Sequence, residues 1–180
     1  MLTKREKTMR GFGLIELLIT ISLLGILTTL AVDNFGTWIQ DTRTRSVAES
    51  LQNGIRLAQT EAIKSSQSTT FTLTGRNWVI ALIPRASTST TISSTTTIHN
   101  GGIPDANFVN IDAANNTSLN FNSMGRLVSP TTNVNYIITN TRGNRRMQVS
   151  VNMAGKVRMC DPDKTLSATS PDGADPNGNC

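Results

Sequence analysis

The hydrophobic pattern divides the chain into a long helix followed by a series of short strands. Residues Phe12 to Val32 are almost all apolar, and in a helix these 21 residues rise about 31 Å, enough to cross the hydrocarbon core of a bilayer. Over residues 33–66 apolar positions recur at spacings of four and three, which predicts an amphipathic continuation of the same helix with one buried stripe. That stripe comprises Val47, Leu51, Ile55, Ala58 and Ala62.

From residue 67 to residue 180 the pattern changes to short alternating runs typical of strands. TTFTLT and NWVIALI flank Gly75-Arg76, an arrangement that predicts a β-hairpin. Five further runs follow, namely FVNI, SLNF, NYIITN, RMQVSV and KVRMC. The low-complexity stretch Ser87–Thr97 has little apolar area, so we expect a mobile loop there, with His99 also in a loop. The expected fold class is α+β, a long N-terminal helix packed on an antiparallel β domain.

The residues before the apolar helix are basic. Residues 1–11 carry four cations against one acid, Glu6. Because positive flanks stay in the cytoplasm, the remainder of the chain is expected to be exported. The small residue at the boundary between charged and apolar segments is Gly11, which precedes the apolar run, whereas an ordinary secretory cleavage site follows it.

A single carboxylate, Glu16, interrupts the apolar helix. At the centre of a bilayer a charged side chain costs roughly 2.5–3.5 kcal/mol on insertion scales, so a carboxylate there usually has a partner or a task. The alternative is a carboxylate that reaches the membrane interface and is tolerated there.

The basic leader, Gly11, Phe12, the Leu14-Ile15-Glu16 run and the apolar helix together resemble the signal of type IV pilins and pseudopilins. The resemblance implies a leader peptide, residues 1–11, that the prepilin peptidase removes between Gly11 and Phe12. It also implies N-methylation of Phe12, a transmembrane and assembly helix over residues 12–32, and pairing of Glu16 with the amine of a neighbouring pilin subunit. The implied location is the inner membrane, by a single pass with a periplasmic domain, and then the pilus at the cell surface. Two departures from the family pattern are Gly13, commonly threonine, and Asp33, often proline.

Two later segments, LNFNSMGRL and GKVRMC, resemble the FimT/GspH group of this class, and the N-terminal helix resembles its FimT members. The group comprises minor pilins and a minor pseudopilin. The resemblance covers most of the chain after the leader and implies a pilin-like fold for it.

Composition fits an exported domain. The formal charge is +5 over 180 residues, and removal of the leader leaves about +2. The two cysteines, Cys160 and Cys180, lie in the exported part, where an oxidising periplasm permits a disulfide. A disulfide between them closes a loop of about 20 residues, which contributes roughly 3 kcal/mol to stability. The alternative is two free thiols.

Nothing in the sequence indicates an enzyme or a cofactor site. The chain has one histidine, no Cys/His metal set, no glycine-rich phosphate loop and no nucleophile beside a base. Four tail aspartates, Asp161, Asp163, Asp172 and Asp175, offer oxygen ligands for calcium, but their spacing matches no calcium loop, which favours a solvated acidic loop.

The most basic segment lies near the C-terminus, with no acid between its first and last arginines. Its five cations are Arg142, Arg145, Arg146, Lys156 and Arg158. Strand alternation places Met147, Val149 and Val151 on one face, and it places Gln148, Ser150 and Asn152 on the other face with Arg146.

The two strands of this segment predict a hairpin whose loop length must bring like faces together. A three-residue loop ending in Gly155 does so, with the glycine at the position that needs a positive φ. This loop opposes Asn152 to Lys156 and Ser150 to Arg158. The two cations then project together, roughly 7 Å apart, beside amide and hydroxyl side chains.

A basic, amide-rich face without aromatic residues suits contacts with phosphates rather than base stacking. The alternatives are a solvated strand face or a contact for an acidic neighbouring subunit. FimT proteins implicated in DNA uptake carry a G-R-x-R motif, and Gly155-Lys156-Val157-Arg158 resembles it, with a lysine that keeps the charge but loses the bidentate fork. The resemblance implies that the basic hairpin binds double-stranded DNA. The predicted contact residues are Lys156 and Arg158, together with Arg142, Arg145 and Arg146.

Two hypotheses therefore remain. The first is a FimT-like minor pilin that takes up DNA in natural transformation. The second is a structural minor pilin or a GspH-like pseudopilin of type II secretion that binds no DNA.

Overall fold

The computed structural model describes residues 13–84, 96–103, 109–113, 117–165, 173–174 and 180. The chain divides into two compact units, Met1–Gly36 and Thr37–Cys180, and each is described by itself. Gly11 and Phe12 lie outside the described residues, as do residues 87–95 of the low-complexity stretch. The last two residues of that stretch, Thr96 and Thr97, lie in a strand and not in the expected loop.

One helix, α1 (Leu14–Ser65), contributes to both units. It begins where the Gly13 carbonyl accepts hydrogen bonds from the amides of Glu16 and Leu17, at 3.1 and 3.2 Å. It ends at Ser65, one residue before the expected boundary, because Ser66 turns to a φ of 54° and the helical path stops. In the second unit the predicted apolar stripe is confirmed, since all five of its side chains are fully buried.

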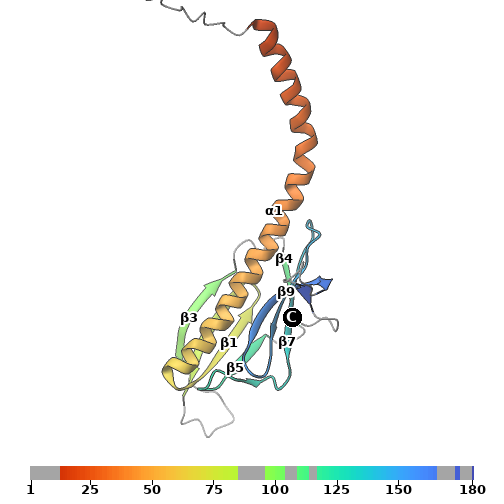
Figure 1. The fold of residues 1–180 in the computed structure, drawn as a ribbon. Helices are drawn as coiled ribbons and strands as arrows, with labels where there is room; N and C mark the ends of the chain where they lie inside the picture. Colours follow the sequence, from red (N-terminus) through yellow and green to blue (C-terminus); the bar gives the residue numbers. More distant parts are fainter. Residues whose placement is uncertain (1–12, 85–95, 104–108, 114–116, 166–172, 175–179) are drawn as a thin grey trace, which may run out of the picture. The chain divides into compact units, whose positions relative to one another are not determined.

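The described strands of the second unit form two five-stranded sheets. Figure 1 shows them beside the second half of α1. The first has the order β3-β2-β1-β5-β6 and the second β10-β9-β8-β7-β4. The strands of the first sheet are β1 (Ser68–Thr74), β2 (Asn77–Ile83), β3 (Thr96–Gly102), β5 (Ser118–Phe121) and β6 (Leu127–Ser129). Those of the second are β4 (Val109–Asp112), β7 (Val134–Asn140), β8 (Met147–Val151), β9 (Val157–Thr165) and β10 (Gly173–Ala174). All pairs are antiparallel except β10 with β9.

A single core joins the buried stripe of α1 to both sheets. Phe71 and Phe121 enter it from the first sheet, and Tyr136 and Val149 from the second. Burial also raises the pKa of the Tyr136 phenol. Each large apolar side chain buried in this way contributes roughly 1.5–3 kcal/mol. The core therefore fixes both sheets against the second half of α1 (Figure 1).

The hairpin predicted around Gly75-Arg76 is confirmed, because β1 pairs with β2 from Ser68–Ile83 to Thr74–Asn77. The expected loop at His99 is wrong, because His99 lies in β3 and pairs with Ile80 of β2. The backbone groups along the edge of β2 need partners, and a polar strand supplies them as well as an apolar one.

Candidate functional site

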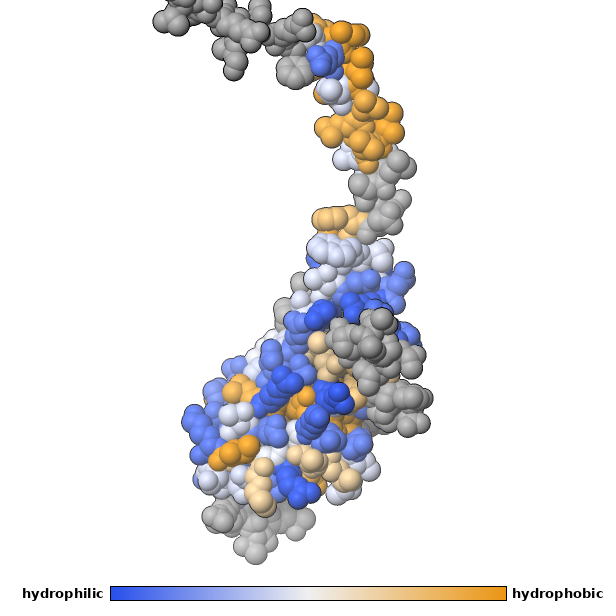
Figure 2. Space-filling model, viewed as in Figure 1, coloured by the Kyte–Doolittle hydropathy of each residue, from blue (hydrophilic) through white to orange (hydrophobic). Residues whose placement is uncertain are grey.

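The first candidate region is the N-terminal half of α1. From Leu14 to Leu27 its leucines and isoleucines are exposed all around the helix; Leu14, for example, is 78% exposed and Leu24 65%. Figure 2 shows hydrophobic colour along the visible side of this segment. Glu16, in the first turn, is exposed as well. A helix that is apolar on every side normally buries its surface in other helices or in lipid.

No helix within the described ranges is both long enough and apolar enough to span a membrane.

The second candidate region is the β8–β9 hairpin, whose predicted register is confirmed. Ser150 pairs with Arg158. The loop is closed by bonds from the Asn152 amide to the Lys156 carbonyl, at 3.1 Å, and from the Gly155 amide to the Asn152 carbonyl, at 2.8 Å. Gly155 has a φ of +85°, as the loop geometry requires. Lys156 and Arg158 are both exposed.

Beside this hairpin lies a small polar pocket of about 140 Å³. Its walls are Asn133, Asn135, Ser150, Val151, Asn152, Lys156, Arg158 and Cys180. Within the described part of the chain, neither Lys156 nor Arg158 forms an ion pair with an acid. The pocket therefore combines two cations with hydroxyl and amide groups and, among its walls, no carboxylate side chain.

Sequence reasoning missed the contribution of β7 to this pocket. Asn135 pairs with Ser150 across β7 and β8, which continues the polar row that Ser150 forms with Arg158. The alternation in NVNYIITN, where Tyr136 is buried, indicates that Asn135 lies on the polar face of its strand. It does not indicate that this strand is the neighbour of β8.

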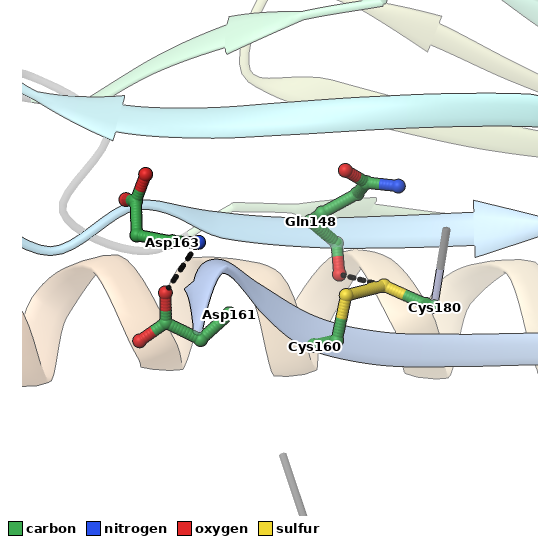
Figure 3. Close-up of a disulfide and its surroundings, with 5 residues drawn as sticks. All are labelled: Gln148, Cys160, Asp161, Asp163 and Cys180. Atoms are coloured by element: carbon green, nitrogen blue, oxygen red, sulfur yellow. Dashed lines mark hydrogen bonds between the residues drawn. A yellow bond between two sulfur atoms is a disulfide. The ribbon is translucent and has the colours of Figure 1, made fainter. Parts of the chain in front are cut away.

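Gln148 follows the expected alternation of β8, but the expectation that it lies exposed beside Lys156 and Arg158 is wrong, because the residue is only 4% exposed. It pairs in register with Cys160, and the predicted disulfide between Cys160 and Cys180 is present. Figure 3 shows the bridge lying against the Gln148 backbone, with the Cys180 sulfur 3.5 Å from the Gln148 carbonyl oxygen. The disulfide bond therefore lies at the end of β8 where Gln148 was expected to extend the exposed polar face.

One side chain of α1 bonds to the hairpin, and a second bonds to the β5–β6 loop that lies against it. The Arg56 guanidinium donates to the Val157 carbonyl at 3.2 Å, and the Gln59 amide donates to the Gly125 carbonyl at 2.8 Å. A Cβ on Gly155 would collide with the Gly125 carbonyl and would lie 2.6 Å from the Gln59 amide nitrogen. The hairpin tip is thus seated closely against the helix and the β5–β6 loop.

The other three predicted contact residues lie at the opposite end of β8. Arg142, Arg145 and Arg146 precede that strand, whereas Lys156 follows it. Arg146 is therefore roughly 20 Å from Lys156 along the sheet and roughly 13 Å from Arg158, which pairs with Ser150. The Asp41 carboxylate fixes the preceding loop to α1 by accepting the Asn144 and Arg145 amides at 3.1 Å. The five cations therefore do not form one cluster.

Two of these three arginines are paired with acids. Arg145 donates to Asp161 at 3.2 Å, and Arg146 makes a two-point contact with Asp163. The hydrogen bond from Arg146 lowers the pKa of Asp163, and it raises the pKa of Arg146. Their positive charge is thus largely compensated within the chain.

The same pairs correct the expectation of a solvated acidic loop after Cys160. β9 continues to Thr165, and Asp161 is buried beside Arg145. The Asp163 amide also donates to the Asp161 carboxylate at 3.1 Å (Figure 3). Asp172 and Asp175 lie outside the described residues, and the described ones contain no group of acids, histidines and cysteines able to hold a metal ion.

Comparison with known proteins identifies two family models along the chain. Residues 47–155 match the type II transport protein GspH, and residues 7–32 match the prokaryotic N-terminal methylation motif. No curated protein matches the chain significantly in sequence.

Solved structures with the same fold include two minor subunits. The type IV minor pilin FimU of Pseudomonas aeruginosa is 18% identical, with a TM-score of 0.54, over 70% of this chain and 95% of that one. The minor pseudopilin EpsH of the Vibrio cholerae type II secretion system is 12% identical, with a TM-score of 0.50, over 69% of this chain and 98% of that one.

These likenesses agree with the expected fold, a long N-terminal helix packed on antiparallel sheets. The GspH model covers more than half of the chain, and proteins of this kind are structural subunits rather than enzymes. The chain belongs to the GspH family of pilins and pseudopilins and carries the N-terminal methylation motif of that class.

Proposed function

We propose that this protein is a FimT-like minor pilin that binds double-stranded DNA through the β8–β9 hairpin during natural transformation. The observation that carries the proposal is the pair Lys156 and Arg158. Both cations are exposed, both lie beside a pocket lined with amides and hydroxyls, and neither has an acidic partner among the described residues.

The chemistry of this surface suits the DNA backbone. Lysine offers a point charge with three donors, and arginine offers a planar fork that matches two phosphate oxygens. Ser150, Asn135 and Asn152 add neutral donors beside them. No aromatic side chain lines the pocket, so base stacking has no platform there. The expected mode is therefore independent of sequence, with contacts to phosphates.

The N-terminal region supplies the assembly role in this proposal. The prepilin peptidase cleaves after Gly11 and methylates Phe12, and residues 12–32 anchor the subunit in the inner membrane by a single pass. Glu16 then pairs with the terminal amine of a neighbouring pilin as the subunit enters the pilus. The match to the methylation motif and the apolar surface of α1 support this part.

A mobility shift with the mature protein in detergent tests DNA binding. Wild-type protein should retard duplexes of unrelated sequence equally, and log K should fall with log salt by about 0.9 for each phosphate contacted. The K156Q/R158Q double variant should bind much more weakly. R146Q is the matched control, because it removes one positive charge from an arginine that is already paired with Asp163.

The second candidate function is that of a structural pseudopilin or minor pilin without DNA binding. The description of the matching family, a type II transport protein, favours it. In that case the basic hairpin contacts an acidic neighbouring subunit. Wild-type protein that fails to retard duplex DNA at 50 mM salt would favour this candidate and overturn the first.

A further inference from the structure

The loop between β8 and β9 has the same sequence pattern and hydrogen bonds as a loop in the other sheet. The loop between β5 and β6 reads Asn122-Ser123-Met124-Gly125-Arg126, and the loop between β8 and β9 reads Asn152-Met153-Ala154-Gly155-Lys156. Both have the pattern N-x-x-G followed by a cation. Each is followed by a buried apolar residue, Leu127 in one case and Val157 in the other.

The hydrogen bonds of the first loop repeat those of the second. The Asn122 amide donates to the Arg126 carbonyl at 3.0 Å, and the Gly125 amide donates to the Asn122 carbonyl at 2.8 Å. The Arg126 amide donates to the Asn122 side chain at 2.9 Å, as the Lys156 amide does to Asn152 at 2.8 Å. The glycine φ is +74° at Gly125, close to the +85° of its counterpart. Arg126 is therefore the local equivalent of Lys156.

The two loops meet at one place on α1. A Cβ on Gly155 would lie 3.2 Å from the carbonyl carbon of Gly125, so the two glycine backbones are already in contact. Arg126 and Lys156 each follow one of these glycines directly, so their Cα atoms are at most about 14 Å apart. Gln59 donates to the Gly125 carbonyl between them, which fixes this spacing to the helix.

Arg126 resembles Lys156 and Arg158 in its exposure and in its lack of an ion pair in the part of the chain that the structure describes. Arg126 is exposed, and within the described ranges it forms no ion pair, as is also true of Lys156 and Arg158. Two of these cations, Arg126 and Lys156, are on the two loops, and the third, Arg158, is in β9. Cations held this close without an ion-pair partner among the described residues repel one another, and a polyanion relieves that repulsion. DNA carries a phosphate about every 1.7 Å of its axis, so phosphates are available to cations at this spacing.

We propose that the loop Asn122–Arg126 is a second phosphate-binding loop, and that Arg126 contacts the DNA backbone together with Lys156 and Arg158. The proposal rests on the proposed function, since it names a further part of the same DNA surface. It makes that surface bipartite, with one loop from each sheet.

The test compares single variants of the full mature protein in detergent, with a fluorescent 30-base-pair duplex as the probe at several salt concentrations. R126Q should weaken binding about three- to tenfold for all sequences and flatten the salt slope by about one unit. R76Q is the matched control. Arg76 is also exposed and follows a glycine of positive φ in a tight turn, but it lies at the far end of β1, roughly 20 Å from Thr69, which pairs beside the Asn122 loop.

The outcomes separate this inference from the proposed function. Weaker binding by R126Q, with R76Q like wild type and unchanged unfolding of both, supports the second loop. Full binding by R126Q while K156Q/R158Q loses binding overturns the second loop and leaves the proposed function standing. Equal losses in R126Q and R76Q also overturn it, because net charge alone would then explain the effect. Wild-type protein that does not bind the duplex overturns both.

Discussion

The guanidinium of Arg56 donates a hydrogen bond to the carbonyl of Val157 across 101 positions of the sequence, at 3.2 Å. Val157 lies between Lys156 and Arg158, so the bond fixes the backbone that carries both proposed phosphate contacts. β9 pairs with β8 on one side at this point, and α1 therefore supplies a donor for a carbonyl on the other side. The position of the basic pair depends on the helix as well as on the hairpin.

Replacing Arg56 by methionine should destabilise the protein modestly and loosen the hairpin. The loss of one hydrogen bond to a charged group is expected to reduce the free energy of unfolding by about 1–3 kcal/mol. Urea unfolding followed by circular dichroism measures this change. R45M is a useful control, because Arg45 pairs with Glu49 on the exposed surface of the same helix, where a salt bridge contributes about 0–1 kcal/mol. Equal losses in the two variants would contradict the special role of Arg56.

Gly155→Ala should be much more disruptive than Gly75→Ala. Both glycines have a positive φ, which costs an alanine roughly 1–2 kcal/mol. At Gly75 a Cβ would meet nothing within 4 Å, whereas at Gly155 it would collide with the Gly125 carbonyl. We therefore expect a further loss of about 1–3 kcal/mol at Gly155, from the displacement of packed backbone. Thermal unfolding of the two variants side by side gives the difference, and equal midpoints would show that the loop contact is unimportant.

Removal of the disulfide should destabilise the β domain by roughly 3 kcal/mol. The bridge joins cysteines 20 positions apart, and the closure of a loop of this size restricts the unfolded chain. The C160S/C180S double variant should lose this stability in chemical denaturation. Wild-type protein that has been reduced before unfolding should behave in the same way. A double variant as stable as the oxidised protein would contradict the expectation.

Stability should fall in acid partly through Asp163. Arg146 lowers the pKa of this carboxylate in the folded state, so its favourable contribution is present above the pKa of the unfolded chain, near 3.9. That contribution is lost as the pH falls through the lowered pKa. Melting temperatures recorded from pH 6 down to pH 2 should therefore fall less steeply for D163N than for wild type. The difference should be small, because both groups are largely exposed to solvent. Parallel curves would contradict the pairing.

Processing at the N-terminus gives an independent prediction. Substitution of Gly11 by a bulky residue should block the leader peptidase and leave a membrane-bound precursor about 11 residues longer than the mature protein. Glu16→Gln should be cleaved normally but enter pili poorly, since it lacks the charge expected to pair with a neighbouring amine. Mass spectrometry of membrane and pilus fractions distinguishes the two defects. Mature wild-type protein that still carries Met1 or Leu2 would contradict the cleavage site.

Features that depend on neighbours along the chain could be predicted from the sequence. The buried stripe of α1 follows from the 3.6-residue period, and the register of the β8–β9 hairpin follows from strand alternation and a loop glycine. The positive φ of Gly155 and the disulfide bond could be predicted for the same reason, because one depends on a tight loop and the other on two cysteines close together in the sequence. The interactions that determine these features join residues at most about 20 positions apart, so the features can be predicted from the sequence pattern.

Features that depend on which elements become neighbours were decided by the tertiary structure. The five cations form one run in the sequence, but β8 separates them, and Asp161 and Asp163 pair with two of them. Gln148 follows the polar alternation, yet it is buried, and the disulfide bond lies against its backbone carbonyl. The contacts of Arg56 with Val157, and of Gly125 with Gly155, join segments from different sheets and the helix. Local periodicity sets only the face on which a residue lies, whereas the packing of the shared core determines what lies opposite that face.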